Sequence, residues 1–428
     1  MRICALWTGD ELLDGRIQEA NGRSLGAWLR ARGHRLWRAL LVGDDEDGLV
    51  AALSWLVTEA DLVVVAGGLG PTEDDRTRAA CARVSGRELV RDADAWQALR
   101  ARYARLGRRW SDAAARQAER PASAARIPNP LGSADGFVFF VGTTPVVVLP
   151  GVPREFDGML DAALTPYVAP SSTDAQELWL YGIGESETNA VARDIATEAG
   201  VSLGWCVQSP LVQLRWEGRG EAVTGAGTAL RRAFAPFVLP EGHRRPETLV
   251  LELLRGGGAT VAIAESCTGG AIASALTDVP GSSAALLAGW VTYANDAKVA
   301  ALGVPREVIV AQGAVSAEVA VAMASGARRA ANATWGGGVT GIAGPGGGSE
   351  TKPVGTAFVA WAGPSGVHVA RVAYPDRDRR EVKALVRDFA LCFLWRCLVG
   401  DLRAVASWVG VVSCPEAEER RLALADRN

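Results

Sequence analysis

Histidine is scarce in this chain of 428 residues, and its cysteines lack the spacing of a metal or redox motif. The histidines, His34, His243 and His368, are far apart in the sequence, so a histidine-rich zinc site or several histidine-based triads have little material. The seven cysteines form no CxxC pair. An odd number in a long chain is typical of reduced thiols in a cytoplasmic protein.

Neither a strong net charge nor a long apolar run marks the chain. The formal net charge is -3, so no basic field attracts an acidic lipid surface, and direct nucleic-acid binding is not expected. The most apolar late stretch, 389–412, contains Arg396, Asp401 and Arg403 and is too charged to span a bilayer. The start, MRICALWTGDELLDG, does not resemble a signal peptide. We therefore expect a cytoplasmic protein that does not cross a membrane.

Lysine is replaced by arginine almost everywhere in the chain. Of the 45 lysine and arginine residues only three are lysines, Lys298, Lys352 and Lys383, which leaves 42 arginines. Lysine can lose its proton under moderate perturbation, whereas arginine effectively cannot. A chain that keeps lysine at so few places invites a search for a special role at each of them.

Buried-strand runs alternate with helical patterns in the first and last parts of the chain. Apolar runs at Arg2–Trp7, Leu36–Val42 and Leu62–Ala66 are separated by segments with helical periodicity. This alternation is typical of a parallel sheet that is covered on both faces. We predict an α/β protein with two three-layer αβα domains, whose sheets are mostly parallel, joined by a small α+β connecting domain. The predicted segments are 1–168, 169–245, 246–414 and a polar tail at 415–428.

The stretch AESCTGGAIASAL places Ser266 where an apolar strand meets a helix. One interpretation is a serine that caps the helix, followed by glycines that permit tight packing. The other is a nucleophile on a strand-to-helix turn, where N–H groups of the new helix can stabilise an oxyanion or bind phosphate. Cys267 competes for the nucleophile role because a thiol is intrinsically better, but its adjacent position points its side chain in another direction.

The stretch TYANDAKVAALGV predicts a short helix with Asn295 as its N-cap and Gly303 as its stop. Lys298 then lies in the first turn, near the positive end of the helix dipole, which disfavours the charged ammonium. The plain alternative is a solvated lysine beside Asp296. The unfavourable position favours a neutral lysine that acts as a base.

A third motif, VTGIAGPGGGSETKPVGTAF, has five glycines around Pro345 and can form a phosphate cradle with Lys352 beside it. Together, ESCTGG, VTYANDAK and TGIAGPGGGSETKPVGT resemble the C-terminal domain of the CinA family (competence/damage-inducible protein A) over residues 246–412. In that family this domain is a nicotinamide-mononucleotide amidohydrolase. The resemblance therefore implies amide hydrolysis without a cofactor.

The resemblance also implies roles for individual residues. Ser266 would be the nucleophile, Lys298 the base that activates it, and Tyr293 a hydroxyl that assists proton transfer. An amide is a poor electrophile and serine a poor nucleophile, so a base and oxyanion donors are both needed, and a serine–lysine pair supplies them without histidine. The implied substrate-binding residues are Thr268, Gly269, Asn295, Thr340, Gly341, Gly344, Gly346, Lys352 and Arg380.

The motifs GDELLDG, GGLGPTEDD and LPGVPRE resemble the N-terminal domain of the same family, and GIGESE resembles its connecting domain. That N-terminal domain shares the fold of molybdopterin-binding proteins, and in some members it hydrolyses ADP-ribose to AMP and ribose 5-phosphate. This chain has Asp10 and Glu19 where the family usually has Thr and Asn. The extra carboxylates could strengthen metal binding or repel a diphosphate.

The glycine-rich motif GGLGPTEDD suits a metal-assisted diphosphate reaction, because glycine N–H groups can bind phosphate oxygens and carboxylates can bind a cation. The plain alternative is an acidic first turn of a helix after a glycine turn. The predicted ligand-binding residues are Gly67, Gly68, Gly70 and Thr72. The predicted ligands of a divalent metal (Mg, Mn or Co) are Asp74, Asp75 and Glu11.

The expected partners are small nucleotides: nicotinamide mononucleotide, with ADP-ribose as a second candidate. The family resemblance also suggests a homodimer. Two other functions stay open. The chain could be a non-catalytic interaction protein that binds RecA-like partners in competence or recombination, or a molybdopterin-binding protein. A purified protein that releases no ammonia favours the former, and co-purifying pterin fluorescence favours the latter.

Overall fold

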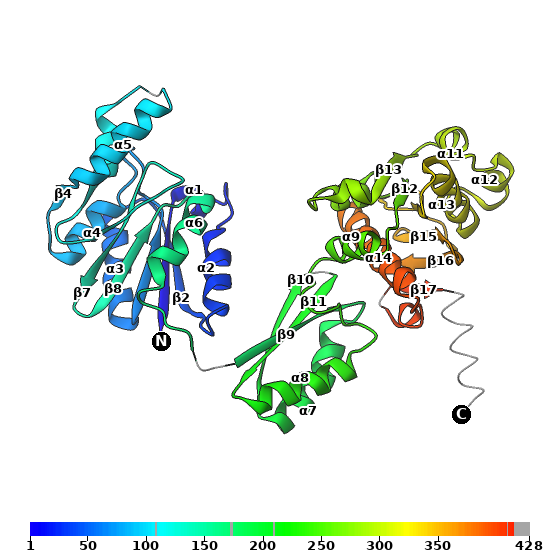
Figure 1. Cartoon of the computed structure of the whole chain (residues 1–428), viewed down its shortest axis with the longest axis horizontal. Coiled ribbons are helices and arrows are strands. Elements are labelled where there is room, and N and C mark those ends of the chain that lie inside the picture. Colours follow the sequence, from blue (N-terminus) through cyan, green and yellow to red (C-terminus); the bar gives the residue numbers. More distant parts are fainter. Residues whose placement is uncertain (108, 172–173, 209, 409, 415–428) are drawn as a thin grey trace. The chain divides into compact units, whose positions relative to one another are not determined.

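The computed structural model describes residues 1–107, 109–171, 174–208, 210–408 and 410–414. The chain divides into two compact units, Met1–Asp174 and Ala175–Asn428 (Figure 1). The expected connecting segment, 169–245, therefore falls mostly in the second unit. The predicted polar tail, 415–428, lies outside the described residues. Among these residues, none of the helices combines the length and the apolar composition that a membrane span requires.

The first unit is built on a six-stranded sheet with the order β2-β1-β3-β8-β7-β6. Strands β2, β1, β3 and β8 are parallel, whereas β7 and β6 are antiparallel to their neighbours. The apolar runs of the sequence form the parallel strands, as predicted. The strands are β1 (Ile3–Thr8), β2 (Leu36–Val42), β3 (Leu62–Ala66), β6 (Ala125–Ile127), β7 (Gly136–Val141) and β8 (Thr144–Leu149).

Helices cover both faces of this sheet. Successive strand residues point to opposite faces: Ile3 and Ala5 pack in one cluster with α2 and α6, while Cys4 and Leu6 pack in the other with α3 and α4. The three-layer prediction is thus confirmed for this unit. The helices and remaining elements are α1 (Asp10–Leu13), α2 (Asn21–Arg30), α3 (Glu46–Glu59), α4 (Thr77–Ser85), β4 (Leu89–Arg91), α5 (Ala93–Arg105), η1 (Asp112–Ala118), β5 (Glu119–Pro121) and α6 (Pro153–Leu164).

The second unit contains two sheets. A three-stranded antiparallel sheet, in the order β10-β11-β9, has its own buried core with two helices. The predicted α+β connecting segment therefore forms this module. Its elements are β9 (Asp174–Tyr181), α7 (Glu185–Ala199), β10 (Ser202–Gln208), β11 (Leu211–Gly218) and α8 (Glu221–Ala233).

The larger sheet of the second unit has the order β13-β12-β14-β15-β16-β17. Strands β13, β12 and β14 are parallel, and β15, β16 and β17 are each antiparallel to the preceding strand in the order. A short turn joins β15 to β16, which leaves no room for a crossover helix between these two strands. The short strand β17 was not predicted. The strands are β12 (Val261–Glu265), β13 (Leu286–Val291), β14 (Trp335–Gly341), β15 (Thr356–Gly363), β16 (Gly366–Ala373) and β17 (Val411–Ser413).

This sheet too lies between two layers of helices. Val261 and Ile263 pack with α9, α10 and α14, whereas Ala264 packs with α11 and α13 on the opposite face. The core that contains α14 also includes Trp179 and Tyr181 of β9, so the three-stranded module shares buried surface with the larger domain. The remaining elements are α9 (Pro246–Gly256), α10 (Ala271–Thr277), η2 (Ser282–Ala284), α11 (Asn295–Leu302), α12 (Arg306–Gln312), α13 (Ala317–Ala331), α14 (Arg379–Val399) and η3 (Val405–Ser407).

Candidate active site

The serine and the lysine singled out in the sequence meet at the carboxyl end of β12. Nζ of Lys298 lies 3.2 Å from Oγ of Ser266. The same nitrogen donates to the backbone oxygens of Thr292 (2.7 Å) and Tyr293 (3.1 Å). Lys298 is 1% exposed and Ser266 is 9% exposed. The fold thus brings together two residues that are 32 positions apart, with the serine at the more accessible end of the pair.

The surroundings of Lys298 disfavour its charged form. Burial lowers the pKa of its ammonium group. Its polar contacts are two backbone carbonyls and the serine hydroxyl, and no carboxylate of a described residue forms an ion pair with it. A neutral amine keeps two N–H groups for the two carbonyls and presents its lone pair to the hydroxyl. The arrangement therefore suits a lysine that accepts the serine proton.

The turn that carries the serine differs from the predicted helix start. Helix α10 begins at Ala271, five residues after Ser266, with Gly270 as its N-cap. The carboxylate of Glu265 accepts N–H groups from Gly270 (3.0 Å), Ile272 (3.1 Å) and Ala273 (2.9 Å). Three of the N–H groups at the helix start, which were expected to stabilise an oxyanion, are therefore occupied. In the preceding turn, residues 266–269, the N–H of Ser266 donates to Val339 and that of Gly269 donates to Ser266, so the N–H groups of Cys267 and Thr268 are the candidate donors.

Cys267 points away from the reactive position. Its side chain belongs to the apolar cluster between the sheet and α14, and the residue is only 6% exposed. Burial raises the pKa of the Cys267 thiol to about 12. A thiolate is therefore scarce at neutral pH, and the geometry favours the neighbouring serine as the nucleophile.

Tyr293 and Asn295 lie near Lys298, but their side chains do not make the contacts that were predicted. The side chain of Tyr293 is exposed, and its hydroxyl accepts a hydrogen bond from Arg379 (2.8 Å). The contact of Tyr293 with Lys298 is made by its backbone oxygen. Asn295 is the first residue of α11 rather than its N-cap, which is Ala294 without a side-chain bond. Lys298 nevertheless lies in the first turn of the helix, as predicted.

The glycine loop, residues 343–355, is anchored at several points. The hydroxyl of Thr340, just before the loop, donates to the backbone oxygen of Ala314 (2.8 Å), and Lys352 donates to that of Gln312 (3.0 Å). Gly341 has no room for a side chain, because an added Cβ would lie 2.7 Å from that of Ala357. The two further glycines predicted to bind substrate lie in the loop itself: Gly344 has φ +84° and Gly346 borders open space.

Two cations of α14 were missed by the sequence prediction. Arg379, not the predicted Arg380, donates to the backbone oxygen of Gly344 (2.6 Å) and joins the glycine loop to Tyr293. Nζ of Lys383 lies 3.3 Å from the position of a Cβ on Gly269. Residues four apart share one face of a helix, and a neighbouring residue points about 100° away, which separates Arg380 from this pair. The i, i+4 spacing of Arg379 and Lys383 in the sequence could have indicated that these two cations lie on the same face of the helix.

The predicted substrate-binding residue Thr268 is fully buried within the serine turn, residues 266–269. Its hydroxyl has no hydrogen-bond partner among the described residues. Gly269 follows with φ +66°, a conformation that glycine adopts without strain. The turn therefore depends on the residue types of the ESCTGG motif.

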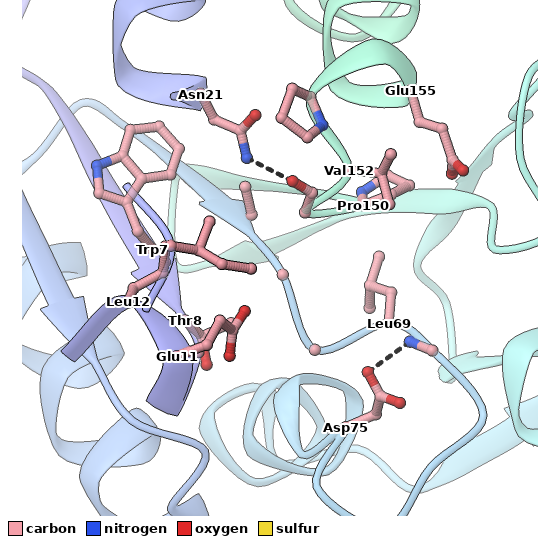
Figure 2. Close-up of a pocket in the computed structure, with 18 of the residues that line it drawn as sticks. Trp7, Thr8, Glu11, Leu12, Asn21, Leu69, Asp75, Pro150, Val152 and Glu155 are labelled. Atoms are coloured by element: carbon pink, nitrogen blue, oxygen red, sulfur yellow. Dashed lines mark hydrogen bonds between the residues drawn. The ribbon is translucent and has the colours of Figure 1, made fainter. Parts of the chain in front are cut away.

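The first unit has a separate pocket of about 460 Å³ at the carboxyl ends of β1 and β3 (Figure 2). Gly67, Gly68 and Gly70 line it, as predicted, together with Trp7 from β1. The edge of an open α/β sheet at which strands end is the usual place for a ligand. The position and size suit a small-molecule ligand.

The predicted metal ligands of this pocket do not form a metal site. One oxygen of Asp75 accepts the N–H of Gly70 (2.6 Å), and the other accepts the N–H (2.8 Å) and the hydroxyl (2.6 Å) of Thr72. Asp74 is exposed, and a hydrogen bond from Thr72 lowers its pKa. Within the described parts of the chain, no three His, Cys, Asp or Glu side chains are grouped to hold a metal ion. The carboxylate of Asp75 thus closes the glycine turn, and the arrangement does not fit the expected divalent cation.

The lining of the pocket is strongly acidic. Its described lining includes no lysine, arginine or histidine. The departures Asp10 and Glu19 accept backbone N–H groups, of Asp44 (3.1 Å) and Gly22 (2.9 Å) respectively. Burial raises the pKa of Asp44. The carboxylates that line the pocket are Glu11, Glu19, Asp44, Asp74, Asp75 and Glu155.

Comparison with known proteins assigns each unit to a class. Residues 4–170 match the family model of a probable molybdopterin binding domain, and residues 244–398 match that of the CinA C-terminal domain. A CinA-like protein of Geotalea uraniireducens is 40% identical over 412 residues, which cover 93% of this chain and 98% of that protein. A CinA-like protein of Geobacter sulfurreducens is 41% identical over 93% of this chain and all of its own length.

Among solved structures, the competence/damage inducible protein CihA of Agrobacterium tumefaciens is 41% identical. It covers 38% of this chain and 99% of its own, with a TM-score of 0.35. The present chain belongs to the CinA family. The family resemblance of the sequence motifs is thereby confirmed.

Proposed function

We propose that the second unit hydrolyses the carboxamide of nicotinamide mononucleotide to nicotinate mononucleotide and ammonia. The observation that carries the proposal is the contact between Ser266 and a buried lysine whose other two polar contacts are backbone carbonyls. A serine hydroxyl needs a base to become a nucleophile, and a desolvated neutral lysine is such a base. The family resemblance supplies the substrate.

The reaction has two halves. Oγ of Ser266 forms a bond to the carboxamide carbon while its proton passes to Nζ of Lys298. The carbon–nitrogen bond then breaks, and the leaving nitrogen takes the proton from Lys298 and departs as ammonia. In the second half, the oxygen of a water molecule forms a bond to the acyl carbon while a proton of the water passes to Nζ of Lys298. The bond between the acyl carbon and Oγ of Ser266 then breaks, Lys298 returns the proton to Oγ, and the acid product leaves as the carboxylate.

Unpaired cations near the pair support a phosphorylated substrate. Lys352, Lys383 and Arg379 form no ion pair with a carboxylate of any described residue. Lys352 and Arg379 donate to backbone carbonyls, and Nζ of Lys383 lies 3.3 Å from the position of a Cβ on Gly269. Cations without acidic partners favour a phosphate monoester. In this proposal Arg379 also orders the glycine loop, through Gly344, on which the nucleotide would lie.

A single assay tests this function. Purified protein is incubated with nicotinamide mononucleotide, with nicotinamide riboside and with nicotinamide, and released ammonia is measured with and without a chelator. The proposal predicts ammonia from the mononucleotide, far less from the two substrates without phosphate, and no effect of the chelator. No release from any of the three would reject the proposal and favour an interaction protein of the kind that binds RecA-like partners.

For the first unit, the glycine turn and the size of the pocket support a nucleotide or pterin ligand. Both oxygens of Asp75 accept hydrogen bonds from its own turn, and the pocket is lined by carboxylates. These features do not support cleavage of ADP-ribose by a bound metal. Incubation with ADP-ribose and Mg, Mn or Co salts, with AMP as the measured product, tests this view, which predicts no metal-stimulated AMP.

A further inference from the structure

Glu265 is the last residue of β12 and directly precedes the serine. It is 1% exposed, and each of its carboxylate oxygens accepts backbone N–H groups of the following turn and helix. Oε2 accepts those of Gly270 and Ile272, and Oε1 accepts that of Ala273. Hydrogen bonds to a carboxylate are stronger than those between neutral groups, so these three bonds hold the segment firmly.

The backbone of Glu265 is also connected to the lysine. Its carbonyl oxygen accepts the N–H of Thr292 (2.8 Å), and the carbonyl oxygen of Thr292 in turn accepts from Nζ of Lys298. On the other side, the N–H of Ser266 donates to Val339 of β14 (2.9 Å). The strand end is thus fixed from both neighbours, and the side chain of Glu265 fixes the turn and the helix start that come after it.

We propose that Glu265 is the positioning residue of the serine. Its carboxylate ties the start of α10 back to the end of β12 and so holds the serine turn in the conformation that places Oγ 3.2 Å from Lys298. The inference rests on the proposed function, because it assigns Glu265 a role in the reaction of Ser266. It also explains why a glutamate ends a strand that is otherwise apolar.

The same carboxylate determines where an anionic substrate can bind. Glu265 accepts three N–H groups at the start of α10, those of Gly270, Ile272 and Ala273, and its own negative charge lies there, so the helix start disfavours a phosphate. The phosphate is directed instead to the cations of α14 and the glycine loop. The oxyanion that develops at the carboxamide is left to the N–H groups of Cys267 and Thr268 in the serine turn, because those of Ser266 and Gly269 donate to backbone carbonyls.

The test measures the reactivity of Ser266 without relying on the natural substrate. A fluorophosphonate probe reacts with an activated serine: the Oγ–P bond forms, the P–F bond breaks, fluoride leaves and the serine proton passes to Lys298. The rate of labelling at Ser266 is followed by mass spectrometry for the wild type, Glu265→Gln and Glu265→Ala. The glutamine variant places an NH2 donor against the N–H of Ala273 and is expected to label about 10-fold more slowly. The alanine variant is expected to label about 100-fold more slowly, as for a misplaced reacting group.

A second variant keeps Glu265 and removes one of its bonds. Ala273→Pro deletes the N–H that donates to Oε1, and it costs no bond within the helix because Ala273 is the third residue of α10, in the first turn. It is expected to label about 3-fold more slowly, between the wild type and Glu265→Gln, since two of three bonds remain. With nicotinamide mononucleotide, all three variants are expected to lose kcat while KM stays within about twofold.

Leu230→Ala is the matched control for general destabilisation. Leu230 is fully buried in the separate core of the three-stranded module, so its loss weakens the second unit without touching the serine turn. It is expected to label at the wild-type rate below its melting temperature. Wild-type labelling rates in folded Glu265→Gln and Glu265→Ala would overturn the inference. So would equal slowing in Leu230→Ala, or a wild-type Ser266 that the probe does not label. A wild type that labels at Ser266 but releases no ammonia rejects the proposed function alone.

Discussion

The two units place a comparable turn at a comparable position and equip it differently. In each, a fully buried strand of a parallel array ends in a glycine-containing turn, after β3 in the first unit and after β12 in the second. In each, one carboxylate closes the turn by accepting three hydrogen bonds: Asp75 after β3 and Glu265 after β12. Asp75, which was predicted to be a metal ligand, thus has the same local role in its turn as Glu265, for which no role was predicted.

The difference lies in the cation behind each turn. Behind the serine turn, Lys298 is buried with its nitrogen on the reactive hydroxyl. Behind the glycine turn, Arg78 is buried with its guanidinium on the backbone oxygens of Leu69, Gly70 and Glu119. Burial lowers the pKa of Arg78 to about 10, which still leaves it charged at neutral pH. The two buried cations therefore have different roles at the same place in the fold. Lys298 suits proton transfer, whereas Arg78 holds the glycine turn in place.

The largest expected effect is that of Ser266→Ala on ammonia release. The variant removes the group that attacks the carboxamide, so the rate should fall by about 1,000-fold or more. Nicotinamide mononucleotide should still bind, because the glycine loop and the cations of α14 are untouched. Steady-state kinetics and isothermal calorimetry measure the two properties. Retained turnover would show that the serine turn is not the reactive one.

Arg78→Met tests the contrasting role of the other buried cation. The variant leaves several buried carbonyls without donors, so the free energy of unfolding of the first unit should fall by about 3 kcal/mol. Amide hydrogen exchange in residues 1–171 measures this loss, with the exposed Arg76→Met as a matched control. Ammonia release by the second unit should be unchanged. A first unit as stable as that of the control would contradict the structural role assigned to Arg78.

Arg379→Gln tests which arginine of α14 serves the site. It removes the bonds to Gly344 and Tyr293, and we expect KM for nicotinamide mononucleotide to rise about tenfold. Arg380→Gln, one residue along on another face of the helix, should change KM by less than about twofold. Steady-state kinetics of the two variants distinguish them. The reverse order would restore the sequence-based assignment to Arg380.

Cys267→Ala should have the smallest effect. The thiol lies in the apolar cluster and its pKa is raised to about 12, so its removal should leave kcat within about twofold. Thermal unfolding should reveal a modest loss of stability from the shortened core side chain. Loss of activity in this variant, with survival in Ser266→Ala, would move the nucleophile one residue along the turn.

The sequence was most informative where one physical pattern dominates. Continuous β-branched runs predicted β3 and the other central strands, and the three motifs of the last domain lie at the ends of neighbouring strands, as expected. Family membership follows from the same motifs. A strong local periodicity is compatible with few kinds of secondary structure, which is why these inferences agree with the structure.

The direction of individual polar side chains was harder to predict. Asn295 was expected to cap α11, but the N-cap is Ala294, one residue earlier. Asp75 was expected to bind a metal, but its oxygens accept donors from its own turn. The role of Arg379 was missed because its partners, Gly344 and Tyr293, come from distant segments of the chain. That of Glu265 was missed because its partners are N–H groups of the following turn and helix, which become available only once the turn folds back on the strand end. A carboxylate or guanidinium in a sequence does not reveal whether its hydrogen bonds are already satisfied.

The central claim is that Lys298 acts as a neutral base toward Ser266, and the pH dependence of kcat/KM tests it most directly. Burial lowers the pKa of Lys298 below its ordinary value of 10.5, and only the neutral amine can accept the serine proton. Ammonia release from nicotinamide mononucleotide should therefore rise with pH through this lowered pKa and fall as the amine becomes protonated at lower pH. In Lys298→Arg the activity should be lost across the whole range, because a guanidinium cannot accept the proton. A Lys298→Arg enzyme with the wild-type rate and the wild-type pH profile would contradict the account.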